Sequence, residues 1–239
     1  MDAIVLAGGK GTRLQRIVGD RPKPMAQVAG RPFVEWLLLA LRSQGLRRVI
    51  LSTGYKGDMV EAHFGGGERL GLKLIYSHED VPLGTGGAAR HALRKVETDR
   101  ALVLNGDSFC QFSVNQLAGV HVQTRAQATL WLVQMDDCRR YGAVEIERNG
   151  NVVAFREKSL DQHAGLINAG VYLFDRHVLA AIPADRPVSL ETDVFPTLIG
   201  RGLHATSGNG VFLDIGTPES YRLADSFIAR NTALWHAAT

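Results

Sequence analysis

The sequence predicts an α/β protein with a mostly parallel main sheet, helices on both faces and a smaller antiparallel part. Over the first half of the chain, apolar strands alternate with helices, as they do in parallel sheets. From about residue 136 the pattern changes to alternating strands, and the pair over 142–158 is joined at Asn149-Gly150, a strong hairpin signal. No repeat, low-complexity tract or linker interrupts the chain, so we expect one continuous domain over 1–239.

The individual elements follow from short signals. Pro32 and Gly45 are expected to begin and end the first helix, because proline favours a first helical turn and glycine favours helix termination. Ser189 is the expected N-cap of a helix that Pro196 divides into two short pieces. Pro218 is expected to begin the last helix. Strands are predicted over 3–7, 48–53, 72–77, 101–107, 128–135 and 168–175, and helices over 32–45, 58–64, 85–96 and 218–230.

Composition excludes several classes of protein. The net charge is +3, and the basic residues are scattered, whereas nucleic-acid binding usually shows as a clustered basic stripe. Cys110 and Cys138 lie in no zinc or disulfide pattern. The first apolar run stops at Gly8 without a signal-peptide pattern, and the run at 36–41 is far too short to span a membrane. We expect a cytoplasmic protein that binds neither nucleic acid nor membranes.

A glycine loop follows the first strand, in the stretch "AIVLAGGKGTRL" at 3–14. The Walker pattern fails, because Gly9-Lys10 is followed by Gly11 instead of serine or threonine. The dinucleotide pattern fails as well, because Leu14 stands where its third glycine belongs. What remains is a general property: glycines after a strand leave backbone N–H groups free to meet an anion. A tight structural turn is the alternative.

Two cations favour the anion-binding interpretation. Arg13 lies two residues after Gly11, and Lys23 lies between Pro22 and Pro24, which restrict its backbone. A lysine that must be positioned against a phosphate benefits from such a restriction, because positioning supplies much of the rate enhancement in phosphoryl transfer.

Two aspartates add a candidate metal site. Asp107 lies at the carboxyl end of the predicted strand 101–107, and Asp214 at the end of a short predicted strand in "FLDIGT". Ligands of open parallel sheets bind at the carboxyl ends of the strands. Two such carboxylates can converge on one Mg²⁺ together with phosphate oxygens. Each aspartate alone is more typical of a turn or a helix cap, and only its combination with the glycine loop favours a metal site. A second glycine loop, "PLGTGGA" at 82–88, enters a helix and would let a flat ring or a phosphate approach.

Together these motifs resemble the sugar-1-phosphate nucleotidyltransferases, also called sugar-nucleotide pyrophosphorylases. The resemblance rests on "LAGGKGTRL" followed by "PKPM" and continues through "LGTGGA", "NGDSF", "YGAV", "REK", "INAGVYLF", "ETDVFP" and "LDIGTPESY". Within the family the chain is most similar to the D-glycero-α-D-manno-heptose 1-phosphate guanylyltransferases. The resemblance implies a Rossmann-like three-layer α/β/α nucleotidyltransferase fold with a mixed, mostly parallel central sheet. A small antiparallel sugar-binding lobe completes it.

The resemblance also implies a role for each matching position. The nucleotide would be bound by Leu6, Ala7, Gly8, Gly9, Gly11, Thr12, Arg13, Gly84, Thr85, Gly86 and Asn105. The sugar phosphate would be bound by Gly142, Glu157, Lys158 and Asn168. Arg13, Lys23 and Asp107 would be catalytic, and Asp107 and Asp214 would hold Mg²⁺. Residues 1–135 would mainly form the nucleotide part, about 136–200 the sugar lobe, and 201–239 the second metal aspartate and the last helix.

The implied reaction joins GTP and heptose 1-phosphate into GDP-heptose and pyrophosphate, for bacterial surface polysaccharide. Mannose 1-phosphate with GTP is the nearest alternative, followed by a hexose or hexosamine 1-phosphate with UTP or dTTP. A non-catalytic nucleotide-sensing homologue is disfavoured, because Arg13, Lys23, Asp107 and Asp214 are all retained. An NAD-dependent oxidoreductase is disfavoured by the failed dinucleotide pattern. A homodimer is the default expectation for the assembly.

Overall fold

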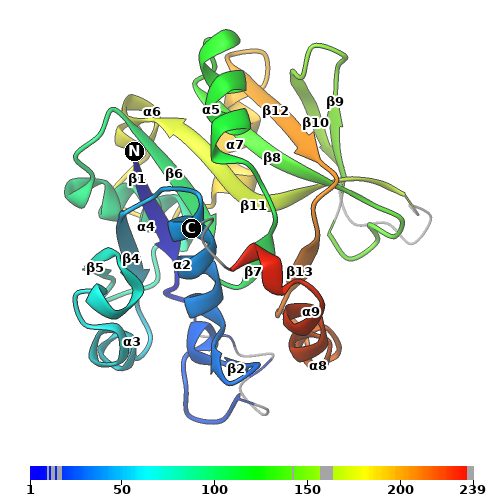
Figure 1. Cartoon of the computed structure of the whole chain (residues 1–239). Helices are drawn as coiled ribbons and strands as arrows, with labels where there is room; N and C mark the ends of the chain where they lie inside the picture. The colour runs from blue at the N-terminus through cyan, green and yellow to red at the C-terminus, as the bar shows by residue number, and fades with distance from the viewer. Residues whose placement is uncertain (10, 12–13, 15–17, 142, 157–163, 236–239) are drawn as a thin grey trace.

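A seven-stranded sheet forms the centre of the protein in this computed structural model (Figure 1). The structure describes all residues except 10, 12–13, 15–17, 142, 157–163 and 236–239. The strand order across the sheet is β12-β8-β11-β6-β1-β4-β5. These strands span β1 (Asp2–Leu6), β4 (Arg48–Thr53), β5 (Lys73–His78), β6 (Arg100–Asn105), β8 (Ala128–Met135), β11 (Gly165–Asp175) and β12 (Leu203–Gly208).

The sheet is mixed and mostly parallel, which confirms the predicted fold class. Strands β5, β4, β1 and β6 pair in parallel, and β12 pairs in parallel with β8. Only β11 runs against both of its neighbours, β6 and β8. The pairing of β11 with β8 shifts between Asn168 and Val171, and Gly170 there has a φ of +73°. This irregularity lies where β11 passes the carboxyl ends of the parallel strands.

Side chains that alternate along the strands build one core on each face of the sheet. Ala3 and Val5 face one core, whereas Ile4 faces the other, as the two-residue period of a strand requires. Helices α2, α3, α5 and α9 contribute to the first core, and α4, α6 and α7 to the second. The helices span α2 (Phe33–Ser43), α3 (Gly57–Phe64), α4 (Gly84–Ala92), α5 (Val114–Gln123), α6 (Arg176–Ala180), α7 (Phe195–Leu198), α8 (Pro218–Arg222) and α9 (Ala224–Arg230).

Three small ladders complete the fold. The predicted hairpin at Asn149-Gly150 is confirmed, since β9 (Ala143–Ile146) and β10 (Val152–Arg156) pair in antiparallel fashion. A second ladder pairs β7 (Ser108–Cys110) with β13 (Phe212–Asp214), side by side in Figure 1. The third joins β2 (Gln27–Val28) and β3 (Arg31–Pro32). Of these, β7–β13 matters for function, because it joins segments that carry the two predicted metal aspartates.

Local signals set many element ends as expected. Ser189 caps the turn η4 (Leu190–Val194), where its side chain accepts hydrogen bonds from two backbone N–H groups, and α7 follows. The last helix is split into α8 and α9, a difference from the single helix predicted over 218–230. Thr217 caps α8 together with Ser220, so Pro218 occupies the first turn as predicted. In the described part of the chain, no helix combines the length and apolarity needed to cross a bilayer.

Candidate functional site

Two cavities open at the carboxyl ends of the central parallel strands. The larger has a volume of about 700 Å³ and the smaller about 300 Å³. Lys23, Asn105 and Asp107 line both of them. Asn105 ends β6, the middle strand of the sheet, so the cavities meet where ligands of open α/β sheets bind.

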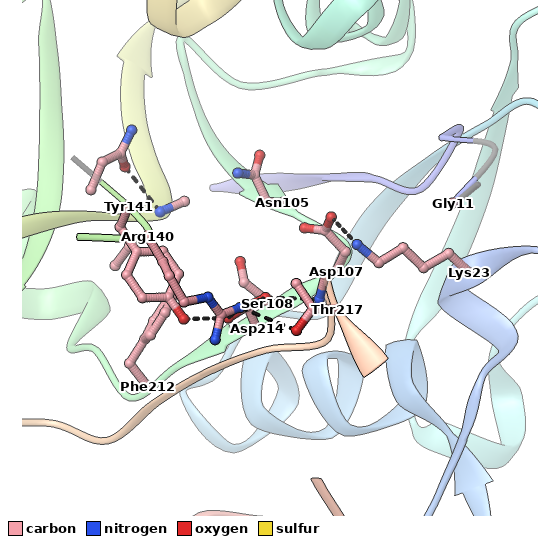
Figure 2. A pocket seen from close by; sticks show the side chains of 14 residues that line it. Gly11, Lys23, Asn105, Asp107, Ser108, Arg140, Tyr141, Phe212, Asp214 and Thr217 are labelled. Atoms are coloured by element: carbon pink, nitrogen blue, oxygen red, sulfur yellow. Dashed lines mark hydrogen bonds and ion pairs between the residues drawn. The ribbon is translucent and has the colours of Figure 1, made fainter. Parts of the chain in front are cut away.

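Lys23 and Asp107 form an ion pair at the junction of the two cavities. The Lys23 Nζ atom donates to Asp107 Oδ2 at 2.6 Å, as Figure 2 shows. The lysine side chain is 12% exposed and the aspartate 48%, so a mostly buried stem carries the ammonium group to an accessible carboxylate. Pro22 is in an extended conformation and the short helical turn begins at Lys23, so the backbone is turned there. This arrangement agrees with the positioning expected from the flanking prolines.

Asp214 reaches the larger cavity from β13 and is also held by cationic and polar partners. Arg140 Nη2 lies 3.4 Å from Asp214 Oδ2, and the Tyr141 hydroxyl donates to the same oxygen (Figure 2). The Gly216 N–H donates to Asp214 Oδ1 at 2.8 Å. Burial raises the pKa of Tyr141, and its bond to Asp214 adds to the shift, so this phenol stays a donor at neutral pH.

The β7–β13 ladder brings the two aspartates to one cavity. Asp214 pairs with Ser108, the residue after Asp107, and the Ile215 N–H donates to the Asp107 carbonyl at 2.9 Å. Both carboxylates line the larger cavity. Among the described residues, no group of three or more His, Cys, Asp and Glu side chains gathers as a metal cluster. Two carboxylates facing one cavity still suit a hard cation that takes its other ligands from phosphates and water.

The described part of the glycine loop approaches both cavities. Gly8 and Gly9 line the smaller cavity, and Gly11 lines the larger. Gly11 has a φ of +60°, and a Cβ atom there would lie 2.6 Å from the Cβ of Lys23. Glycine is therefore required at this position both by the backbone conformation and by the space that Lys23 occupies.

The smaller cavity gathers most of the predicted nucleotide residues. Leu6, Ala7, Gly84 and Thr85 line it, together with Glu79, which the sequence analysis missed. Glu79 Oε1 accepts from the Ser52 hydroxyl at 3.0 Å, and Oε2 accepts from the Leu83 N–H at 3.2 Å. The position of Glu79, directly after β5, could have indicated it, because that strand also ends at the ligand-binding edge.

The remaining predicted residues fall into three groups. Asn168 lines the larger cavity, and its Oδ1 accepts from the Gly170 N–H at 3.0 Å. Gly86 is buried and absent from the described lining of both cavities, and its N–H donates to the Val188 carbonyl at 2.8 Å. Five further positions lie outside the described residues, namely Thr12, Arg13, Gly142, Glu157 and Lys158.

Comparison with known proteins identifies the family. A model of the nucleotidyl transferase family matches residues 2–231. The chain belongs to this family. The family match confirms the resemblance and the enzyme class inferred from the motifs, and the central sheet with two cavities at its carboxyl edge agrees with it.

Relatives of this nucleotidyl transferase span several substrates. The chain is 41% identical to a mannose-1-phosphate guanylyltransferase of Mycobacterium tuberculosis, over 98% of the chain and 66% of that protein. It is 37% identical to a D-glycero-alpha-D-manno-heptose 1-phosphate guanylyltransferase of Aneurinibacillus thermoaerophilus, over 94% of the chain and 96% of that protein. The crystal structure of HddC from Yersinia pseudotuberculosis complexed with GMP-PN is similar at a TM-score of 0.84 and 33% identity, covering 95% of this chain and 99% of that one.

Proposed function

We propose that the protein transfers a guanylyl group from GTP to a sugar 1-phosphate, forming a GDP-sugar and pyrophosphate. D-glycero-α-D-manno-heptose 1-phosphate is the proposed acceptor, and mannose 1-phosphate is the second candidate. The observation that carries the proposal is the meeting of two cavities at Lys23 and Asp107. Relatives named guanylyltransferases of either sugar phosphate, 37–41% identical to the chain, support it.

The chemistry follows from the charges at this junction. A sugar 1-phosphate oxygen attacks the α-phosphorus of GTP, a new P–O bond forms, and the bond to the departing pyrophosphate breaks. The attacking oxygen is already anionic at neutral pH, so the site needs no general base. Two anions must approach each other, and Lys23 is placed to offset their repulsion and to stabilise charge in the transition state.

Asp107 and Asp214 would hold Mg²⁺ in this proposal, because both carboxylates face the larger cavity. A bound Mg²⁺ would supply positive charge at the phosphates. Their present partners, Lys23 for Asp107 and Arg140 for Asp214, are cationic, which matches a site built to hold positive charge beside two carboxylates.

Glu79 supports guanine as the base. A carboxylate only accepts hydrogen bonds, and guanine offers two adjacent donors, N1–H and the N2 amino group. Uracil and thymine offer one imide N–H between two carbonyl oxygens, and those oxygens would face the negative charge. Glu79 lines the smaller cavity and, unlike Asp107, is not paired with Lys23, so it is the carboxylate that we propose makes this distinction.

The sugar is the less constrained half of the proposal. The heptose and mannose share the same ring configuration and differ in the arm beyond C5, so one ring pocket can serve both. Asn168 lines the larger cavity and can donate to or accept from ring hydroxyls. The predicted roles of Glu157 and Lys158 at the sugar phosphate, and of Arg13 at the pyrophosphate, stay predictions. So do the division into a nucleotide part and a sugar lobe, the homodimer and the cytoplasmic location.

Pyrophosphate release across a matrix of nucleotides and sugar 1-phosphates tests the proposal. GTP, UTP and dTTP are each paired with heptose, mannose, glucose and N-acetylglucosamine 1-phosphates. We expect turnover with GTP and the heptose phosphate to exceed every other pair. Turnover restricted to UTP or dTTP contradicts guanylyl transfer, whereas preference for mannose 1-phosphate replaces only the proposed sugar.

Asp107→Asn tests the metal assignment. The change keeps the shape of the side chain and removes the charge, and we expect turnover to fall by about 10²–10³-fold or more. The Lys23 pair is half exposed, so the free energy of unfolding should fall by only about 1 kcal/mol. Steady-state kinetics and urea unfolding on the same preparation measure both. A variant with full Mg²⁺-dependent activity would show that Asp107 does not hold the metal.

A further inference from the structure

A chain of hydrogen bonds joins the smaller cavity, the proposed nucleotide cavity, to the larger cavity, the proposed sugar cavity. Its middle members lie behind the residues that line the cavities. It begins at Thr85, which lines the smaller cavity, and ends at Asn168, which lines the larger. Between them lie Glu191, in the turn η4, and Tyr172, a fully buried residue of β11. Glu191 does not occur among the described lining residues of either cavity.

The contacts form a continuous path. The Thr85 hydroxyl donates to Glu191 Oε2 at 2.7 Å. The Tyr172 hydroxyl donates to Glu191 Oε1 at 3.3 Å and accepts from Asn168 Nδ2 at 2.9 Å. Ser189 also donates to Glu191 Oε2, at 2.9 Å. The Glu191 carboxylate therefore contacts Thr85 of the nucleotide cavity through Oε2. Through Oε1 it contacts the Tyr172 phenol, which in turn contacts Asn168 of the sugar cavity.

The direction of each bond is fixed by the neighbouring donors. The Thr85 hydroxyl accepts from the Leu190 N–H at 2.8 Å, so its proton is directed to Glu191. The Tyr172 hydroxyl accepts from Asn168, so its proton is directed to Glu191 as well. Glu191 is thus the common acceptor of both branches, a role that a carboxylate fills and an amide fills only on one side.

We propose that Glu191 is a positioning residue that fixes Thr85 at the nucleotide cavity and, through Tyr172, Asn168 at the sugar cavity. The proposal rests on the proposed function and adds a means by which the two substrates are kept aligned for in-line attack. Alignment matters because small misplacements of reacting groups reduce the rate steeply. A purely structural role of Glu191 would stabilise the turn η4 and leave substrate affinity unchanged.

Glu191→Gln, Tyr172→Phe and the double variant separate these two roles. Glu191→Gln should raise the KM of both GTP and the heptose 1-phosphate, by about 10-fold each, because it breaks charge-assisted hydrogen bonds on both branches. Tyr172→Phe should raise only the KM of the sugar phosphate. In the Tyr172→Phe background, Glu191→Gln should still raise the KM of GTP and add little to that of the sugar phosphate.

Asp193→Asn is the matched control. Asp193 is exposed, lies in the same turn and accepts from the Ser189 N–H at 2.7 Å through Oδ2. Asp193→Asn should lower the melting temperature, because it weakens a hydrogen bond within the turn. It should leave the KM values of GTP and of the heptose 1-phosphate unchanged. Glu191 variants that behave like this control, losing melting temperature alone, overturn the proposal, and Tyr172→Phe decides it if Glu191→Gln does not fold.

Equilibrium binding of GTP and of the heptose and mannose 1-phosphates, measured by calorimetry, distinguishes the two levels of the argument. Wild-type protein that binds no GTP overturns the proposed function and this inference with it. Wild-type protein that binds both substrates, with Glu191→Gln and Tyr172→Phe binding them equally well, overturns the inference alone. Weaker binding of both substrates to Glu191→Gln and of the sugar phosphate to Tyr172→Phe supports it.

Discussion

Lys23 is one of the three described residues that line both cavities. Its ammonium group meets Asp107 where the cavities join, and its stem fills the space that Gly11 leaves free. A partly exposed ion pair of this kind contributes little to stability, so its value lies in placing one positive and one negative charge beside reacting phosphates. The neighbouring residues can then be assigned to one substrate or the other by the cavity they line.

At the residue scale, Glu79→Gln tests the source of base selectivity. Glutamine offers an N–H donor beside its acceptor, so it can pair with uracil or thymine and accepts only one of the two guanine donors. We expect the ratio of kcat/KM for GTP to that for UTP to fall by about 10–100-fold, the range set by a bidentate pair. The ratio is measured with one sugar 1-phosphate held constant.

The Ser52→Ala variant provides the control for this experiment. Ser52 donates to Glu79 Oε1 at 3.0 Å but does not occur in the described lining of the smaller cavity. Its loss should loosen Glu79 and change the nucleotide ratio less than Glu79→Gln does. An unchanged ratio in Glu79→Gln would mean that guanine is recognised by other groups, backbone N–H and C=O groups among them.

At the scale of elements, the sequence predicted the long strands of the main sheet better than the short elements that bring the site residues together. The strands 48–53 and 128–135 match β4 and β8, because apolar runs bounded by turn residues are a local signal. A short strand ending at Asp214 was predicted, but β7 and its pairing with β13 were missed, since each strand has three residues and is defined only by its distant partner. Helices α5 and α6 and strand β12 were missed as well.

The same distinction holds for the site. Lys23, Asp107 and Asp214 could be proposed from their positions after strands or between prolines, which are local features. Glu191 could not, because its contacts with Thr85 and Tyr172 cross 106 and 19 residues of sequence. Glu191 and Thr85 lie in the motifs "ETDVFP" and "LGTGGA", but the motifs do not show that the two side chains meet, because this depends on how η4 packs beside α4.

The glycine loop provides a prediction at this scale. Gly11→Ala adds a Cβ atom 2.6 Å from the Cβ of Lys23 in a backbone with a φ of +60°. We expect Lys23 to be displaced from Asp107 and turnover to fall by about 10²-fold or more, comparable to the loss of a preorganised charge. Steady-state kinetics with GTP and the heptose 1-phosphate measure the effect.

Gly19→Ala separates displacement of Lys23 from backbone strain. Gly19 has a similar φ of +65°, but a Cβ atom there would meet nothing within 4 Å. Both variants should lose about 1 kcal/mol of unfolding free energy from the unfavourable backbone conformation. Only Gly11→Ala should lose turnover, and an equal loss in Gly19→Ala would attribute the effect to the backbone of the loop region.

At the scale of the whole molecule, the two ends of the sheet serve different purposes. The carboxyl ends of β1 and β6 open onto the cavities, whereas at the opposite end of the sheet the buried His121 of α5 forms a polar cluster with residues of β8 and β11. His121 Nδ1 lies 2.8 Å from the Thr129 hydroxyl, and Nε2 lies 3.2 Å from Asp175 Oδ1. This contact joins α5 to β8 and β11 and is far from the chemistry in the fold, so its protonation should act on stability.

Burial lowers the pKa of His121 below its ordinary value of 6.5, against the opposing effect of Asp175, while Arg100 and His204 lower it further. The unfolded chain therefore binds a proton at a higher pH than the folded protein does. As the pH falls below about 6.5 toward the folded pKa, the free energy of unfolding should decrease, with a slope of at most about 1.4 kcal/mol per pH unit from this group. His204 contributes in the same direction, because burial lowers its pKa too.

Replacing His121 by glutamine should remove its part of this slope, because glutamine does not titrate. Urea unfolding between about pH 7.5 and 5, above the range in which most carboxylates titrate, measures the slope for each variant. His177→Gln, at an exposed position of α6, should leave the slope of the wild-type protein unchanged. If the unfolding free energy of His121→Gln falls with pH as steeply as that of the wild type over this range, the acid sensitivity originates outside the His121 cluster.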